Sequence, residues 1–327
     1  VMAKGKSGCF LCQGNMPDDE RGIALSDDWT IYPNVSPYEK GHFVLVRNES
    51  FEKHPYQRID DIDTVSMALD ILWRLAVEEG VGDYKISFNG VGAAASSEHF
   101  HYQGFRINLP VERFGVEYLS RKEGVKVGVV SEYPVKVNVV EGVEKNKVAQ
   151  EVFGVINQLS LACPPITYNI LFSANREIGF KAYIYPRRSE TPSSVREGLL
   201  NIKYGIMEMS GVSIVYSKEE ADKYSEKAMR ESLIAAGYPK VSSAIISGRL
   251  AGSNIFTAFD KDQDDGDTHT SSSIGGQDIL KLIEDLMGGM YIEDGCSRLY
   301  AARELSYYCD LRAIPVFIEM LLEIYHS

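Results

Sequence analysis

The pattern of apolar residues in the first third of the chain changes between helical and strand spacing. Apolar residues recur in steps of three and four through residues 62–76, which predicts an amphipathic helix that Gly80 is placed to end. Short apolar and aromatic runs, broken by Pro or Gly, predict strands at residues 29–48, 83–90 and 98–107. Strands and helices mixed in this way predict a layered α+β or α/β fold.

A similar order of elements begins again after residue 145, so we expect two halves, residues 1–145 and 146–245. The elements expected in the second half are a helix (146–162), a hairpin (166–188), a strand (205–216) and a helix (218–237). Ser217 and Glu220 form the S-x-x-E pattern of a capping box at the start of the last helix.

The remaining C-terminal part has a different composition. Residues 258–276 are acidic and rich in Ser and Gly, which predicts a flexible linker. An EF-hand calcium loop starting at Asp260 is the alternative, but its glycine falls at position seven and Ser271 stands where a glutamate is needed. Residues 277–327 predict a small all-α segment that resembles one HEAT-type repeat, a surface for self-association or for a protein partner.

Composition excludes several classes of function. The 327 residues carry a formal net charge of −12 and no basic stretch, so we expect no nucleic-acid partner. No apolar run is long enough to cross a membrane, and the first residues lack the apolar core of a signal peptide. Five cysteines is an odd count, which favours a reducing compartment, so we expect a cytoplasmic protein.

The stretch "NGVGAAASSEHFHYQGF", residues 89–105, carries the most specific chemistry. On a strand, His99, His101 and Gln103 would project from one face, about 7 Å from one to the next. A neutral imidazole is a nucleophile toward phosphorus, an amide can hold a phosphate oxygen, and the small residues before them allow close approach. An ordinary polar strand surface is the alternative. The G-x-G-x-x-A spacing within the stretch does not open a helix, which argues against a dinucleotide-binding fold.

These residues resemble the active-site segment of the transferase branch of the histidine-triad superfamily. That branch contains galactose-1-phosphate uridylyltransferase, diadenosine tetraphosphate phosphorylase and the GDP-hexose phosphorylases, and the last group is the most similar. "YNILFS", "GFKAYIYPR" and "MEMSGVSIVYSKEEADKYSE" also resemble its second half, so the resemblance covers about residues 9–240. It implies two histidine-triad-like halves, each with an antiparallel sheet flanked by helices.

The resemblance also assigns roles that the spacing alone leaves open. It implies that His101, rather than His99, is the nucleophile and that Gln103 contacts the transferred phosphate. The residues that would line the nucleotide phosphates are Asn89, Gly92, Ser96 and Ser97. Arg187 and its neighbour Arg188 are cations that could meet phosphate or sugar, or could simply end a strand in solvent.

Cys9 and Cys12 form a C-x2-C pair, which is half of a tetrahedral zinc site or two reduced thiols. Some uridylyltransferases bind a structural metal through such a pair and two histidines. Carried over by this resemblance, the other two ligands of a structural Zn²⁺ would be His99 and His54, with His42 as a competitor for the last position.

The resemblance implies an enzyme that cleaves a nucleoside-diphosphate sugar of the GDP-hexose type through a covalent nucleotidyl-histidine, with phosphate as acceptor. Uridylyltransferases usually have Pro between the two histidines, and Phe100 in that place favours the phosphorylases. The alternatives are a dinucleoside polyphosphate phosphorylase or hydrolase and a non-catalytic nucleotide-binding scaffold.

Overall fold

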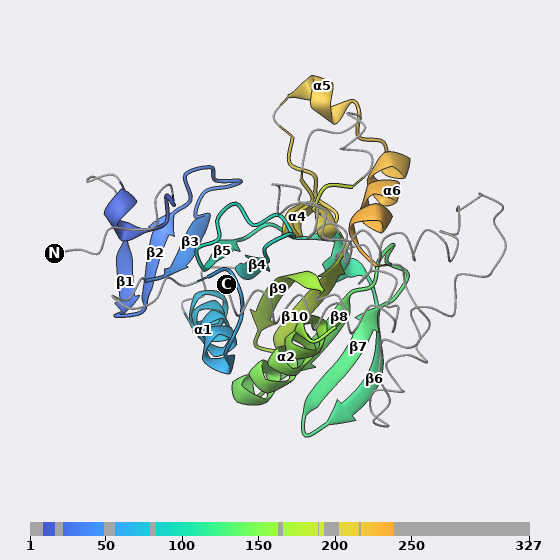
Figure 1. Cartoon of the computed structure of the whole chain (residues 1–327). Coiled ribbons are helices and arrows are strands. Elements are labelled where there is room, and N and C mark those ends of the chain that lie inside the picture. Colours follow the sequence, from blue (N-terminus) through green and yellow to red (C-terminus); the bar gives the residue numbers. More distant parts are fainter. Residues whose placement is uncertain are drawn as a thin grey trace, which may run out of the picture. The chain divides into compact units, whose positions relative to one another are not determined.

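Ten antiparallel strands form a single sheet in the part of the chain that the structure describes (Figure 1). This computed structural model describes residues 9–16, 22–48, 56–78, 83–162, 166–188, 190–192, 203–215 and 217–238. The predicted linker (258–276) and helical segment (277–327) lie outside these residues. The strands are β1 (Ile23–Ser26), β2 (Trp29–Pro33), β3 (Phe43–Arg47), β4 (Lys85–Asn89), β5 (His101–Phe105), β6 (Val116–Lys122), β7 (Val125–Val130), β8 (Asn138–Gly142), β9 (Thr167–Asn175) and β10 (Gly179–Arg187).

The order of the strands divides the sheet into two sides of five. The spatial order is β1-β2-β3-β5-β4-β9-β10-β8-β7-β6, so β1 to β5 form one side and β6 to β10 the other. The chain therefore changes sides between β5 and β6, earlier than the expected boundary near residue 145. The sides are joined where β4 pairs with β9, from Lys85 opposite Ser173 to Asn89 opposite Asn169.

Two helices cover one face of the sheet, which we call the helix face. They are α1 (Ile62–Trp73), continued by the π turn η2 (Arg74–Glu78), and α2 (Lys145–Ser160). Figure 1 shows them side by side over the central strands, with which both make contacts. Asp61 begins α1 because its carboxylate accepts the Thr64 amide proton (2.7 Å), and the Tyr102 hydroxyl of β5 donates to the Thr64 carbonyl (3.1 Å). Both predicted helices are thus confirmed.

The third layer lies on the opposite face and corrects two predictions. The expected strand at 205–216 is wrong: Ile206–Met209 form a helical turn, α4, whose apolar side chains enter the core. The expected helix at 218–237 is interrupted, forming α5 (Lys218–Ala221) and α6 (Glu226–Ala236). The Ser217 cap is confirmed, but Ser225 caps a second start by accepting the Ala228 amide proton at 3.1 Å.

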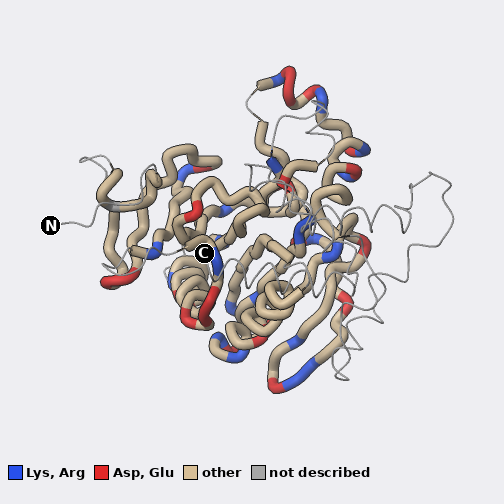
Figure 2. The backbone as a smooth tube through the Cα atoms, viewed as in Figure 1, with Lys and Arg blue, Asp and Glu red and all other residues tan. Residues whose placement is uncertain are grey.

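Charged residues of both signs are interspersed along the described part of the chain. Figure 2 shows acidic and basic residues together on α5, on α6 and at the turn between β6 and β7. No helix among the described residues is long and apolar enough to span a membrane.

Candidate active site

The face of the sheet opposite α1 and α2 forms the floor of a cavity of about 840 Å³, and we call it the cavity face. Register places Val44, Gln103, Ser87 and Leu171 on this face, since residues paired across antiparallel strands share a face. His101, which is opposite Val46, shares the same face. Tyr32 of β2 is opposite Val44 and also shares this face. The described residues of the floor that line the cavity include Tyr32, Val44, Asn89, His101 and Gln103.

His101 is held in one tautomer. Its Nδ1–H donates to the backbone carbonyl of His99 (2.8 Å), so the lone pair of the neutral ring is on Nε2. Only 3 % of the residue is exposed, and this burial lowers the pKa of the imidazole to about 4. The ring is therefore uncharged at neutral pH, with the lone pair of Nε2 available to accept or to attack.

Gln103 stands two residues further along β5 and faces the same cavity. The Tyr38 hydroxyl donates to Gln103 Oε1 (3.4 Å), so this bond uses the oxygen of the amide and not its protons. Tyr38 is itself placed by His42, because the Tyr38 amide donates to His42 Nδ1 (3.0 Å) and the two rings lie 4.3 Å apart. His42 thus supports the cavity wall.

The other residues expected to bind phosphate separate into two groups. Asn89 and Ser96 line the cavity, whereas Gly92 and Ser97 are not among its described lining residues. Gly92 takes a positive φ of 76° in the turn after β4, which a side chain would strain. Ser97 lies beside the cysteines instead: its Oγ is 3.5 Å from Cys9 Sγ and accepts the His99 amide proton at 3.1 Å.

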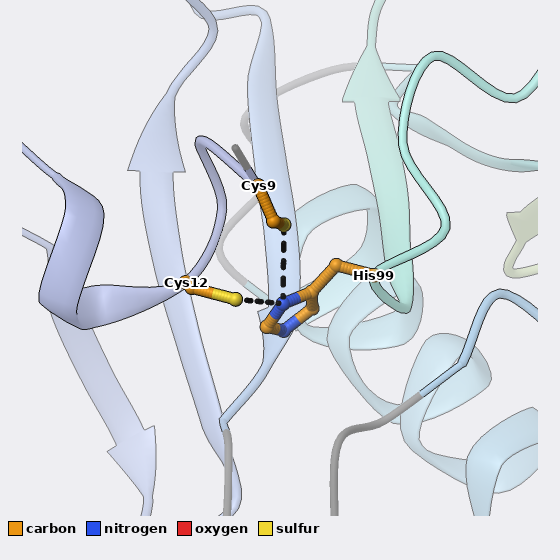
Figure 3. A group of neighbouring side chains, drawn as sticks. All are labelled: Cys9, Cys12 and His99. Carbon is orange, nitrogen blue, oxygen red and sulfur yellow. Dashed lines mark hydrogen bonds between the residues drawn. The ribbon is translucent and has the colours of Figure 1, made fainter. Parts of the chain in front are cut away.

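Three of the four predicted metal ligands converge (Figure 3). His99 Nδ1 lies 3.4 Å from Cys12 Sγ and 3.7 Å from Cys9 Sγ. His99 Nε2–H donates to the Arg47 carbonyl (2.7 Å), which fixes the tautomer with the Nδ1 lone pair facing both sulfurs. His54, the fourth predicted ligand, lies outside the described residues, and His42 does not join this cluster.

The cluster fits a tetrahedral zinc ion. With Zn–S near 2.3 Å and Zn–N near 2.05 Å, a tetrahedral ion separates its nitrogen and sulfur ligands by about 3.6 Å. The two observed separations lie on either side of that value. Two thiolates and an imidazole whose other nitrogen binds a carbonyl are also the donors typical of structural zinc.

The sequence matches two described families, one after the other. Residues 3–106 match a "Domain of unknown function (DUF4922)", and residues 110–238 match "GDPGP1-like, C-terminal domain". The junction between the two matches falls between β5 and β6, where the chain changes sides of the sheet.

Relatives and solved structures agree with this result. GDP-L-galactose phosphorylases 2 and 1 of Arabidopsis thaliana are 26% and 28% identical to the chain over 204 and 205 residues, 59% of this chain in each case. The chain spans less than half of their length, 44% and 43%. The crystal structure of yeast Ap4A phosphorylase Apa2 superimposes with a TM-score of 0.56 at 14% identity, covering 72% of this chain and 82% of that one. The superposition shows a shared α+β fold, and the resemblance inferred from the sequence is confirmed.

The region that matches the GDPGP1-like model supplies a wall of the cavity through residues 203–214. Lys203 is the cationic member of the described lining, and its Nζ donates to Glu190 (2.6 Å). Glu190 also accepts the Ala94 amide proton (3.0 Å), which ties the wall to the turn after β4. Glu208 accepts the Gly205 amide proton (2.9 Å), and burial raises the pKa of its carboxyl.

Sequence reasoning did not single out Lys203 or Glu208. Their segment has a short apolar run that reads as a strand, and such runs do not distinguish strands from buried helical turns. Their charges, within an otherwise mostly apolar segment, are the sequence feature that could have pointed to Lys203 and Glu208.

Arg187 is the last residue of β10 and is not among the described residues that line the cavity. Only 2 % of it is exposed, and burial lowers the pKa of its guanidinium to about 10. The guanidinium donates to Asn169 Oδ1 and, through Nε, to the Ala236 carbonyl (3.2 Å). Asn169 in turn donates to Asn89 Oδ1 (2.7 Å), so Arg187 supports the cavity floor from behind.

Replacing Arg187 with Met is expected to lower the free energy of unfolding by about 3 kcal/mol. The buried Asn169 Oδ1 loses a charged donor, and the Ala236 carbonyl keeps only the Arg188 amide proton. Urea denaturation measures this loss. Arg188→Met is the matched control: Arg188 is exposed beside the Tyr238 ring, and its loss should cost less than about 0.5 kcal/mol. Unchanged stability together with a raised KM would instead support the substrate-binding role predicted from the sequence.

Proposed function

We propose that the chain is a nucleotidyl transferase of the phosphorylase type that cleaves a nucleoside-diphosphate sugar of the GDP-hexose class. The observation that supports it best is the state of His101: a buried, neutral imidazole with its proton on Nδ1, at the floor of a cavity large enough for a nucleotide. The similarity to two GDP-L-galactose phosphorylases supports the choice of substrate class.

In the first step, His101 Nε2 forms a bond to the α-phosphorus, and the bond from that phosphorus to the bridging oxygen breaks. The sugar 1-phosphate leaves with the electron pair. The ring keeps its Nδ1 proton and becomes cationic, and the His99 carbonyl stabilises that charge because it already accepts this proton. In the second step, a phosphate oxygen attacks the same phosphorus, releases the imidazole and forms the nucleoside diphosphate.

The cavity walls suit the two ends of such a substrate. Gln103, through its amide protons, and Lys203, through its positive charge, can stabilise phosphate oxygens as charge develops. Glu208 can only accept hydrogen bonds while ionised, which suits sugar hydroxyl groups. Phe10 and Leu11, from the segment that carries the cysteines, add apolar side chains to the lining.

The same proposal includes a structural zinc ion held by Cys9, Cys12 and His99, with His54 as the fourth ligand. When bound, the ion would fix the ring of His99 and the N-terminal segment, and it takes no part in the reaction.

The two five-strand sides of the sheet are proposed as the two histidine-triad-like halves. The C-terminal segment, residues 277–327, is proposed to be HEAT-like and to contact a protein partner or a second copy.

A labelling assay tests the function. The protein is mixed with GDP-glucose carrying ³²P at the α-phosphorus, quenched in base and analysed for label on the protein; phosphate is then added. We expect label that phosphate removes as free GDP. UDP-sugars, ADP-sugars and dinucleoside polyphosphates are tested beside it, and label from the last group alone would assign the alternative phosphorylase. No label and no turnover with any of them would contradict an enzymatic function.

A further inference from the structure

The strand that carries the nucleophile separates from its neighbour just before it reaches His101. β4 and β5 are paired from Lys85 opposite Phe105 to Ser87 opposite Gln103. Continuing this register by two residues would place Asn89 opposite His101, but no such backbone pair forms. The two residues that flank the gap both line the cavity.

The side-chain amide of Gln57 fills the gap. Its Oε1 accepts the His101 amide proton at 2.7 Å. Its Nε2 donates to the His101 carbonyl at 3.0 Å and to the Asn89 carbonyl at 2.9 Å. The amide of Gln57 thus replaces the hydrogen bonds that the two backbones would otherwise make with each other.

Gln57 is fixed in its own position. Only 2 % of the residue is exposed, and its backbone amide donates to the Glu98 carbonyl (2.7 Å). Tyr56 forms an isolated antiparallel bridge with His99, the residue whose carbonyl accepts the Nδ1 proton of His101. Gln57 therefore holds His101 from a segment that also orders the residues just before it.

We infer that Gln57 is the positioning residue of the nucleophile: it keeps β4 and β5 apart and sets the depth at which the His101 ring meets the substrate. This inference rests on the proposed function. Without the amide, the His101 and Asn89 backbone groups must either pair directly, which closes the gap, or stay buried without partners. Either outcome moves the imidazole, and a misplacement of about 1 Å costs on the order of 100-fold in rate.

The test uses Gln57→Met, which has a similar length and no amide, and Gln57→Asn, whose amide is one methylene shorter. The readouts are the single-turnover rate of protein labelling from ³²P-labelled GDP-glucose and the Kd for GDP. We expect the rate to fall about 100-fold in both variants while the Kd for GDP stays unchanged. Thr30→Val is the control, because it removes a buried hydrogen bond to Asn48 (2.9 Å) on β2 without touching β5. Its labelling rate should equal that of the wild type.

Labelling of both Gln57 variants at the wild-type rate would overturn the inference and leave the proposed function intact. So would a parallel loss of rate, GDP affinity and melting temperature, because that pattern is what general destabilisation produces. If Gln57→Met fails to fold, Gln57→Asn decides between these outcomes. Absence of label on the wild type contradicts the proposed function itself, and the inference then falls with it.

Discussion

Replacing His101 with Gln is expected to abolish the labelled intermediate and to lower kcat by on the order of 10⁴-fold or more. The amide of Gln fills most of the space of the imidazole but cannot form a bond to phosphorus. His101→Gly is tested beside it as a variant that leaves the space open. The measurements are base-stable label on the protein and steady-state release of GDP.

Controls on the same variant separate a loss of chemistry from a loss of folding or of GDP binding. Its melting temperature and its Kd for GDP should stay close to the wild-type values, because His101 contributes one hydrogen bond through its ring and the strand remains paired with β3. Full labelling of His101→Gln would contradict the assignment. If replacement of His99 removed the label while His101→Gln kept it, the nucleophile would be His99.

Replacing Cys12 with Ser is expected to remove the proposed zinc ion. Loss of one of the four proposed ligands would remove about a quarter of a binding free energy of roughly 10–16 kcal/mol, which is about 70- to 900-fold in affinity. Zinc content after dialysis, measured by plasma emission, checks this directly. The Kd for GDP should also rise, because Phe10 and Leu11 of the same segment line the cavity.

Cys163→Ser is the matched control, since Cys163 stands alone in the sequence and its replacement removes one thiol as well. It should retain the metal content of the wild type. Equal zinc content in Cys12→Ser and wild type would show that the converging thiols and His99 hold no ion. Loss of zinc without any change in the Kd for GDP would show that the cavity wall does not depend on the metal.

The sequence predicted those elements that have a strong local pattern. The helix of α1 and the hairpin of β9 and β10 have long, regular apolar spacing, and both lie where it placed them. No strand was predicted at residues 116–142. β6 is an edge strand without a buried position, and it carries Arg121 and Lys122 near its end. Its alternation of apolar and polar residues is therefore weak.

The candidate site was predictable where its residues are neighbours in sequence. His101 and Gln103 share one short motif, and the cysteine pair has a recognisable spacing. Gln57 and Glu208 carry no such signal, since chain topology alone brings them to β5 and the cavity. Arg187 was a candidate because two adjacent arginines at a strand end can meet a phosphate. The structure buries it, and its guanidinium donates to Asn169 and to the Ala236 carbonyl.

The pairing of β4 with β9 has a consequence for how this protein can be divided. Five residue pairs join the two sides of the sheet there, and both strands lie in its interior. Cutting the chain between residues 106 and 110, where the two family matches meet, would give each fragment a long apolar edge open to aggregation. The two matched regions are therefore not separate folding units, and we expect that they must be expressed on one chain to fold.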